Sequence, residues 1–142
     1  MSQTPDAVAR DWFESVWHKL DESAIDRLMH PEAVAHGLGP ESLHGPAGFK
    51  PFFHAFKGAF SNIRIHIERA VTQGDVVAVL CHVTANHAGD AFGPATRRDV
   101  DFWGTSIIRV RDDQIVEGWN TFDFLTMYQQ MGWVANPVTQ RA

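Results

Sequence analysis

Apolar residues near the start of the chain recur at the spacing of an α-helix. Thr4 can cap a helix, Pro5 suits its first position, and Asp6 lies in the first turn, where the helix dipole favours an anion. The apolar residues that follow at three- and four-residue spacing are Val8, Trp12, Phe13, Val16, Trp17 and Leu20. This pattern predicts an amphipathic helix of about four turns that packs a wide apolar face on a large neighbour.

Two further helices are predicted before the middle of the chain. Residues 23–29 place Ile25, Leu28 and Met29 on one face, and Pro31 stops this helix at His30. Residues 32–36 then form a short extended piece, followed by a glycine-containing loop. A third helix, over about residues 47–60, keeps Pro51 in its first turn. Its apolar face is made of Phe49, Phe52, Phe53, Phe56 and Phe60.

The hydrophobic period changes to two after Ser61. Ile63, Ile65 and Ile67 alternate with polar residues, which is typical of a half-buried strand. Three more strands are predicted over residues 76–86, 100–110 and 115–122, the last two joined by a tight hairpin at residues 111–114. Helices first and antiparallel strands afterwards predict an α+β fold, with the helices on one face of a curved sheet.

Length and composition agree with one globular domain over residues 1–142. Hydrophobic residues make up 44% of the chain and charged residues 20%, and no apolar run reaches the roughly 20 residues that a membrane span requires. The first residues lack the pattern of a signal peptide, so we expect a cytoplasmic protein with no membrane partner. The net charge of −5, with scattered Lys and Arg, makes nucleic acid an unexpected partner.

The histidines and the single cysteine give no metal signature. The eight histidines include no His-Glu-x-x-His motif, and His82 and His87 should point to opposite faces of one strand. Cys81 lies in an apolar strand and is predicted to be a buried small hydrophobe. No glycine-rich phosphate loop is present. The sequence therefore predicts no metal and no cofactor.

A series of short motifs carries a family resemblance. They are residues 30–37 (His-Pro-Glu-Ala-Val-Ala-His-Gly), 44–46, 74–79, 86–89 with Gly93, 107–110, 115–119, Asp123 and 130–132. In this order and spacing, from Trp12 to Gly132, the sequence resembles the SnoaL-like branch of the NTF2-like superfamily. The resemblance implies a cone-shaped α+β barrel of the kind found in aromatic polyketide cyclases.

The resemblance also indicates where chemistry would be expected. In polyketide cyclases of this family, a His on the fourth strand and an Asp on the last strand act as acid and base on a carbonyl compound. Counting back from Arg109 and Asp123, these positions fall on Ser106 and Asn120. An amide can polarise a carbonyl but cannot remove a carbon-bound proton, and a serine without a base is a poor nucleophile. Asn120 therefore either orients a substrate or has a packing role.

Three other side chains are candidates for proton transfer. His36 ends the extended piece, which in this fold can face the barrel mouth, and is the best remaining general base. His87 is either a contact for a ligand in the pocket or an anchor for the following loop. Asp123 stands where the last strand gives way to a helix, so it is either catalytic or a cap for the first helical amides.

Aromatic residues are candidates for the wall of an apolar cavity. They are Trp17, Phe53, Phe56, Phe102 and Phe122, although an aromatic stripe at helical spacing also suits a packed core. Trp119 either lines the cavity or fills a subunit contact. Gly118, on the face of Asn120, would leave room for a ligand, and Glu117 would then face solvent or a dimer surface.

The hypothesis that follows is a homodimeric protein that binds a small lipophilic carbonyl compound and, in an enzymatic version that the sequence leaves open, converts it by cofactor-independent acid–base chemistry of the cyclase or isomerase type. The alternative is a non-catalytic binding or interaction module in which Ser106 and Asn120 remain from a lost active site. Fold does not decide between the two.

Overall fold

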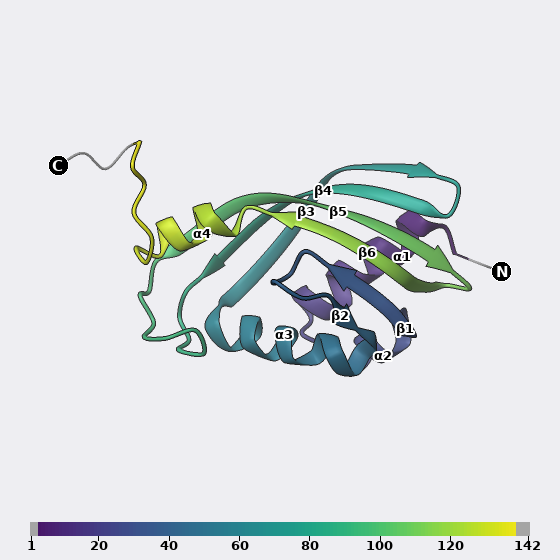
Figure 1. The fold of residues 1–142 in the computed structure, drawn as a ribbon, viewed down its shortest axis with the longest axis horizontal. Coiled ribbons are helices and arrows are strands. Elements are labelled where there is room, and N and C mark those ends of the chain that lie inside the picture. The colour runs from purple at the N-terminus through teal and green to yellow at the C-terminus, as the bar shows by residue number, and fades with distance from the viewer. Residues whose placement is uncertain (1–2, 139–142) are drawn as a thin grey trace.

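The computed structural model describes residues 3–138, and it has a layer of helices on the concave face of one curved sheet (Figure 1). The sheet has six strands in the order β2-β1-β6-β5-β4-β3. It does not close, since β2 and β3 remain as its two edges. The predicted α+β segregation is confirmed. None of the helices in residues 3–138 has both the length and the apolar character needed to cross a membrane.

The first predicted helix is present but changes geometry halfway. Helix α1 (Pro5–Trp12) begins at the cap Thr4, whose hydroxyl accepts a hydrogen bond of 3.1 Å from the Ala7 amide. It continues as the π-helical segment η1 (Phe13–His18). Leu20 lies beyond the helix with a φ of 53°. The predicted apolar face is buried in the core, where Trp12 packs on Phe49 and Trp17 on Phe53.

The first strand begins earlier than predicted. Helix α2 (Ser23–Leu28) ends one residue short of the prediction, and β1 (Met29–His36) follows directly. β1 lies parallel to β6, with a register shift between Met29 and Val34. Pro31 falls inside that irregularity, where its missing amide hydrogen breaks no ladder bond.

The third helix also begins earlier than predicted. A two-residue strand β2 (Leu43–His44) pairs with β1 and leads into α3 (Gly45–Ala59). Pro51 therefore lies inside the helix and not in its first turn, which corrects the prediction. Because Pro51 has no amide hydrogen, the carbonyl of Ala47 loses its intrahelical partner.

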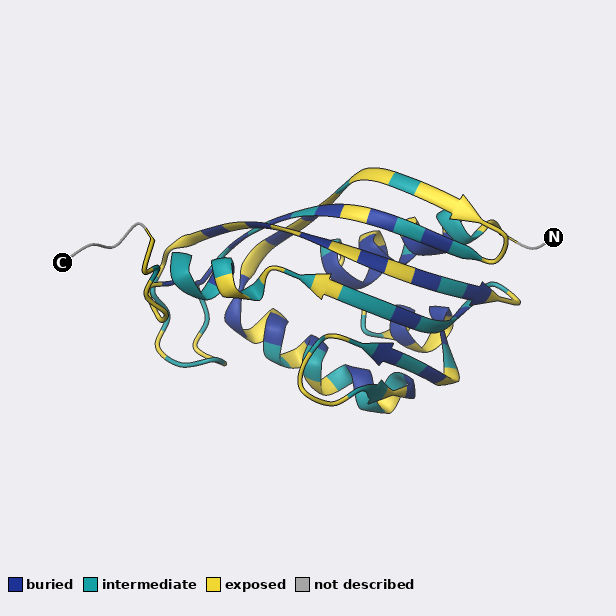
Figure 2. Cartoon of the chain, turned by 45° about the horizontal axis from the view of Figure 1, so that its top comes forward, coloured by how far each residue is buried: buried dark blue, intermediate teal, exposed yellow. Residues whose placement is uncertain are grey.

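Four long antiparallel strands form the rest of the sheet: β3 (Ser61–Gln73), β4 (Val76–Asn86), β5 (Asp99–Arg111) and β6 (Gln114–Phe122). Buried and exposed residues alternate along most of β5 (Figure 2). The hairpin between β5 and β6 turns at Asp112 and Asp113, both with positive φ, as a two-residue turn of the favoured hand requires. The chain then enters α4 (Phe124–Gln130).

Candidate functional site

An apolar cavity of about 90 Å³ lies between the helices and the inner face of the sheet. Aromatic side chains of α1, η1 and α3 form one wall. They are Trp12, Phe13, Trp17, Phe49, Phe52 and Phe56. The opposite wall comes from the strands and the segment after β6. Its apolar members include Ile63, Ile65, Val83, Phe102, Ile108, Ile115, Phe122 and Phe124.

One polar pair stands on the sheet wall of this cavity. Ser106 of β5 and Asn120 of β6 are direct cross-strand partners, and both line the cavity. The Ser106 hydroxyl donates a hydrogen bond of 2.8 Å to Asn120 Oδ1. Asn120 Nδ2 donates one of 2.9 Å to the main-chain carbonyl of His36. Because a carbonyl can only accept, this contact fixes the orientation of the amide.

The pair keeps hydrogen-bonding capacity for a ligand. Asn120 Nδ2 has two hydrogens and gives one to His36, so the second remains. Ser106 Oγ donates its hydrogen to Asn120 and can still accept. Gly118, two residues before Asn120 on the same face, also lines the cavity and places no side chain of its own beside the amide.

His36 does not face this cavity. Its neighbour Ala35 points inward and lines the cavity, so the alternation of the strand turns His36 to the outer face. There His36 Nε2 lies 2.8 Å from Glu117 Oε2, and Nδ1 lies 2.8 Å from Ser42 Oγ. The expectation that this region brings His36 to the barrel mouth is therefore wrong.

His87 is sealed beneath the loop that follows β4. The ring is fully buried, Nδ1 accepts a hydrogen bond of 3.1 Å from the Thr96 amide, and Phe60 and Trp133 pack on the ring. Burial lowers the pKa of His87. His87 is not part of the cavity lining. Of the two predicted roles, this geometry is that of a loop anchor.

Asp123 caps helix α4 at the surface. Its Oδ1 accepts a hydrogen bond of 3.0 Å from the Thr126 amide and its Oδ2 one of 2.6 Å from the Thr126 hydroxyl. These bonds lower the pKa of Asp123. The side chain is absent from the cavity lining, so its geometry is that of the capping alternative.

The predicted wall residues divide between cavity, core and outer face. Trp17, Phe56, Phe102 and Phe122 line the cavity. Phe53 is fully buried in the core instead, where it packs on Trp17 at 5.5 Å between ring centroids. Trp119 lies on the outer face, stacked on His36 at 5.8 Å. The alternation of β6 explains this, because Asn120 is the neighbour that points inward.

Several residues that line the cavity were not predicted from the sequence, although the hydrophobic pattern of the helices marks some of them. Trp12 stands five residues before Trp17 on the same apolar helical stripe, and Phe49 belongs to the same stripe as Phe56. Leu38 lines the cavity from the loop after β1, and no periodic pattern marks it.

The histidines and the cysteine among residues 3–138 form neither a metal site nor an exposed thiol. Within residues 3–138 no three His, Cys, Asp or Glu side chains are grouped as metal ligands would be. His82 stacks on Trp103 on the outer face, whereas His87 follows the end of β4 and is buried, so the two do not share one strand as predicted. Cys81 is fully buried, and burial raises the pKa of its thiol to about 12.

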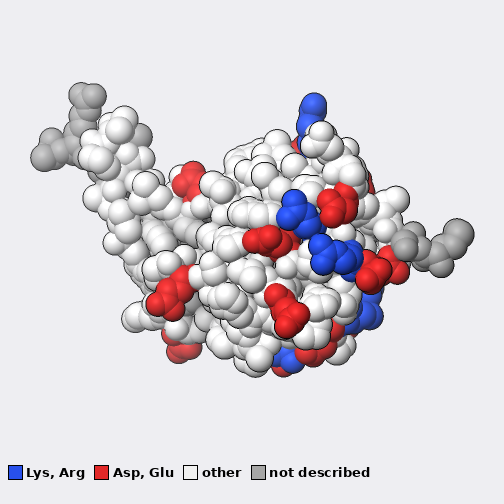
Figure 3. Space-filling view, turned by 45° about the vertical axis from the view of Figure 1, so that its right-hand side comes forward, with Lys and Arg blue, Asp and Glu red and all other residues white. Residues whose placement is uncertain are grey.

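The surface of the sheet end carries charges of both signs. Lys, Arg, Asp and Glu side chains are intermingled on the face seen in Figure 3, which shows no extended patch of a single sign.

On the outer face of the sheet, Leu80, Trp103 and Ile107 are 38%, 45% and 42% exposed. These three residues lie on adjacent strands and form what we term the outer apolar patch.

Comparison with known proteins agrees with this architecture. A family model described as SnoaL-like polyketide cyclase matches residues 7–131. No curated protein matches the chain.

Solved structures from several bacteria share the fold. A candidate SnoaL-like polyketide cyclase from Jannaschia sp. CCS1 superposes with a TM-score of 0.82 at 18% identity, covering 92% of this chain and 93% of that one. A candidate polyketide cyclase from Acidithiobacillus ferrooxidans gives 0.81 at 23%, with 95% and 99% covered. IdmH from Streptomyces antibioticus, also a candidate polyketide cyclase, gives 0.80 at 24%, with 92% and 99% covered. The NTF2-like fold predicted from the sequence is confirmed.

Proposed function

The chain belongs to the SnoaL-like polyketide cyclase family, and we propose that it binds a small lipophilic carbonyl compound in the cavity. In this proposal Asn120 and Ser106 orient the compound, and no cavity side chain acts as acid or base. An enzyme that works by acid–base chemistry would require such groups, so the residues that line the cavity decide between binding and acid–base conversion.

The observation that carries the proposal is one polar pair in an otherwise apolar wall. A ligand that fits among aromatic rings gains from burial, and a carbonyl oxygen placed at Asn120 accepts the second amide hydrogen. The Ser106 hydroxyl holds the amide in place through its bond to Oδ1. A ligand without an acceptor oxygen would leave this amide hydrogen unpaired, which costs binding energy.

The lining of the cavity argues against acid–base conversion. Among the described residues that form the wall there is no Asp, Glu, His, Lys, Arg, Cys or Tyr. Asn120 does not titrate, and His36, His87 and Asp123 have their side chains elsewhere. The non-catalytic alternative is therefore the function that this geometry supports best.

Template-directed ring closure is a second candidate function. The family and its relatives, which are candidate polyketide cyclases, favour it. The second amide hydrogen of Asn120 would stabilise negative charge that develops on a carbonyl oxygen. The proton acceptor would then be water or the substrate itself, because the wall offers none.

We further propose that the protein is a cytoplasmic homodimer, with the outer apolar patch at the subunit contact. Leu80, Trp103 and Ile107 would be covered by the same residues of a second copy, as an isologous contact requires.

The binding proposal is tested with two compounds of matched shape. Isothermal titration calorimetry compares 4-ethylacetophenone, which has one carbonyl, with 1,4-diethylbenzene, which has none. We expect the protein to bind the ketone about 5-fold more tightly, and Asn120→Leu to remove that preference. Thr121→Ala, on the outer face of the same strand, is the control and should keep it. Equal affinity for both compounds, or no binding of either, would contradict the proposal.

A further inference from the structure

We propose that Trp12 and Trp17 provide a second hydrogen-bonding position in the cavity, opposite Asn120. The bound molecule would then carry acceptor oxygens at two opposed positions, not at one. This inference rests on the proposed binding function and narrows its ligand class.

Both tryptophans are held inside the cavity wall. Trp12 and Trp17 are 8% and 6% exposed, and both line the cavity. Trp12 packs edge-to-face on Phe49 at 5.1 Å between ring centroids, and Trp17 packs in the same way on Phe56 at 5.7 Å. Such packing fixes each indole ring, so its N–H direction is set before a ligand arrives.

Neither indole N–H has an acceptor among residues 3–138. An indole nitrogen can only donate, and a buried tryptophan N–H usually finds a partner. The only side-chain nitrogen or oxygen in this part of the chain that is both sealed from solvent space and unpaired is His87 Nε2. The two indole nitrogens are therefore unpaired and not sealed from accessible space, and both residues line the cavity.

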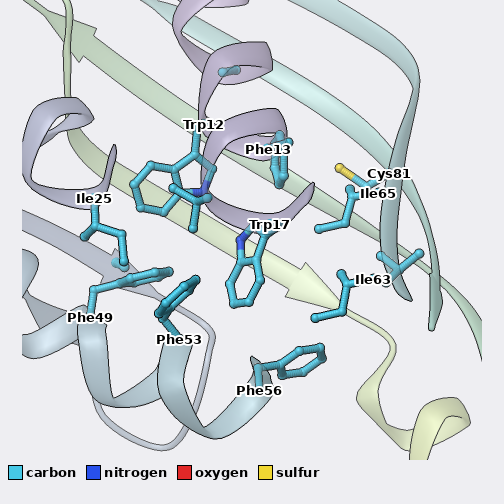
Figure 4. Packing of buried hydrophobic residues seen from close by; sticks show 14 of the residues in the cluster. Trp12, Phe13, Trp17, Ile25, Phe49, Phe53, Phe56, Ile63, Ile65 and Cys81 are labelled. Carbon is cyan, nitrogen blue, oxygen red and sulfur yellow. The ribbon is translucent and has the colours of Figure 1, made fainter. Parts of the chain in front are cut away.

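The two donor positions lie on opposite walls. Trp12 and Trp17 belong to α1 and η1, whereas Asn120 and Ser106 belong to the sheet. In the view of Figure 4 the indole nitrogens lie on the facing edges of the two rings, between the helices. A flat molecule that spans from the sheet to the helices can place one oxygen at each wall.

The test uses three para-disubstituted benzenes of the same shape: 1,4-diacetylbenzene, 4-ethylacetophenone and 1,4-diethylbenzene. They carry two, one and no carbonyls. Calorimetric titration of the wild-type protein should show a gain of about 5-fold in affinity for each carbonyl added. Equal affinity for the diketone and the monoketone would overturn the inference while leaving the proposed function intact. No binding of any of the three would overturn both.

Substitution of Trp12 or Trp17 tests whether an indole N–H binds the second carbonyl of the diketone. Trp17→Phe and Trp12→Phe remove the donor and keep an aromatic ring, and we expect at least one to abolish the preference for diketone over monoketone. Trp119→Phe, on the outer face, is the matched control and should keep that preference. A preference that survives in both cavity variants would show that the indoles are only apolar wall.

A spectroscopic measurement needs no change in the cavity. The protein has five tryptophans, so ¹⁵N labelling gives five indole N–H signals, and Phe substitutions at Trp103, Trp119 and Trp133 assign the three others. We expect 1,4-diacetylbenzene to move a Trp12 or Trp17 signal downfield and 1,4-diethylbenzene to leave it without a downfield shift. Equal shifts with both compounds would overturn the inference.

Discussion

The side-chain amide of Asn120 donates a hydrogen bond of 2.9 Å to the main-chain carbonyl of His36, and this contact joins the cavity to the outer face of the sheet. The His36 ring lies on the outer face, bonded to Glu117 and Ser42. The main-chain carbonyl of His36 thus accepts a hydrogen bond from the amide of Asn120, while the His36 ring bonds Ser42 in the loop after β1. The His36 carbonyl therefore helps to hold the Asn120 amide, while the His36 residue is not part of the cavity lining.

The close approach of β1 and β6 beyond His36 depends on Gly37. Its φ is +85°, and a Cβ at this position would lie 1.8 Å from the main-chain oxygen of Asn120. We predict that Gly37→Ala lowers the free energy of unfolding by about 2–4 kcal/mol, because it combines left-handed strain with a backbone clash. Urea denaturation measures the change.

Gly39, in the same loop, is the matched control. A Cβ there meets no atom within 4 Å, and its φ is not in the left-handed region. Gly39→Ala should leave stability within about 0.5 kcal/mol of the parent protein. A similar decrease in the free energy of unfolding in both variants would mean that any substitution in this loop is destabilising, and that the contact of Gly37 with Asn120 is not the cause.

The sequence was sufficient to predict the order of helices and strands because each has a clear hydrophobic period. Along β6, the strict alternation of strands correctly put Gly118 and Asn120 on one face. The predicted start of the first strand was wrong, because Pro31 normally ends a helix or strand. Pro31 can lie within β1 only because the register of β1 against β6 shifts at this point.

The candidate site was harder to predict because it depends on which face a short strand presents. His36 and Ala35 are adjacent, and a change of one residue in register exchanges cavity and surface. Nothing in residues 32–36 alone sets that register, which comes from the parallel pairing with β6. Phe53 and Phe56 show the same limit on a helix, because both rings pack on Trp17 and yet only Phe56 lines the cavity.

Acid should destabilise the protein through His87. Burial holds the pKa of this imidazole below its ordinary value of about 6.5, so below that pH the unfolded chain binds a proton that the folded chain excludes. Stability is therefore complete above about pH 6.5 and falls as the pH drops toward the lowered pKa of the folded state, by at most about 1.4 kcal/mol per pH unit.

The contribution of His87 can be isolated by substitution. His87→Phe keeps an aromatic ring between Phe60 and Trp133 and removes the titrating group. Urea denaturation at pH 7 and pH 5 should show a smaller loss between the two pH values in this variant than in the wild type. His66→Phe, at an exposed position, should retain the wild-type loss. An unchanged pH dependence in His87→Phe would assign the acid sensitivity to other groups.

The proposed homodimer depends on the outer apolar patch. Trp103 stacks on His82 at 4.5 Å and leaves 45% of its surface exposed. We predict that Trp103→Arg places a charge at the subunit contact and shifts the protein from dimer to monomer, as measured by sedimentation equilibrium. Leu125→Arg, at an equally apolar exposed position on α4, should leave the mass unchanged. A wild-type monomer, or a Trp103→Arg dimer, would contradict this assignment.

Introducing a carboxylate at position 120 should give the cavity the base that its wall lacks. In Asn120→Asp the carboxylate would lie among apolar groups and opposite the His36 carbonyl, and both surroundings raise its pKa. We predict that the variant accelerates the Kemp elimination of 5-nitrobenzisoxazole on the order of 100-fold over the wild type, with a rate that rises as the new carboxyl ionises. Thr121→Asp adds the same charge on the outer face and should give no acceleration. If the wild type already catalyses the reaction with a titrating base, or if Asn120→Asp does no better than Thr121→Asp, then the absence of a base in the cavity is not what limits proton transfer.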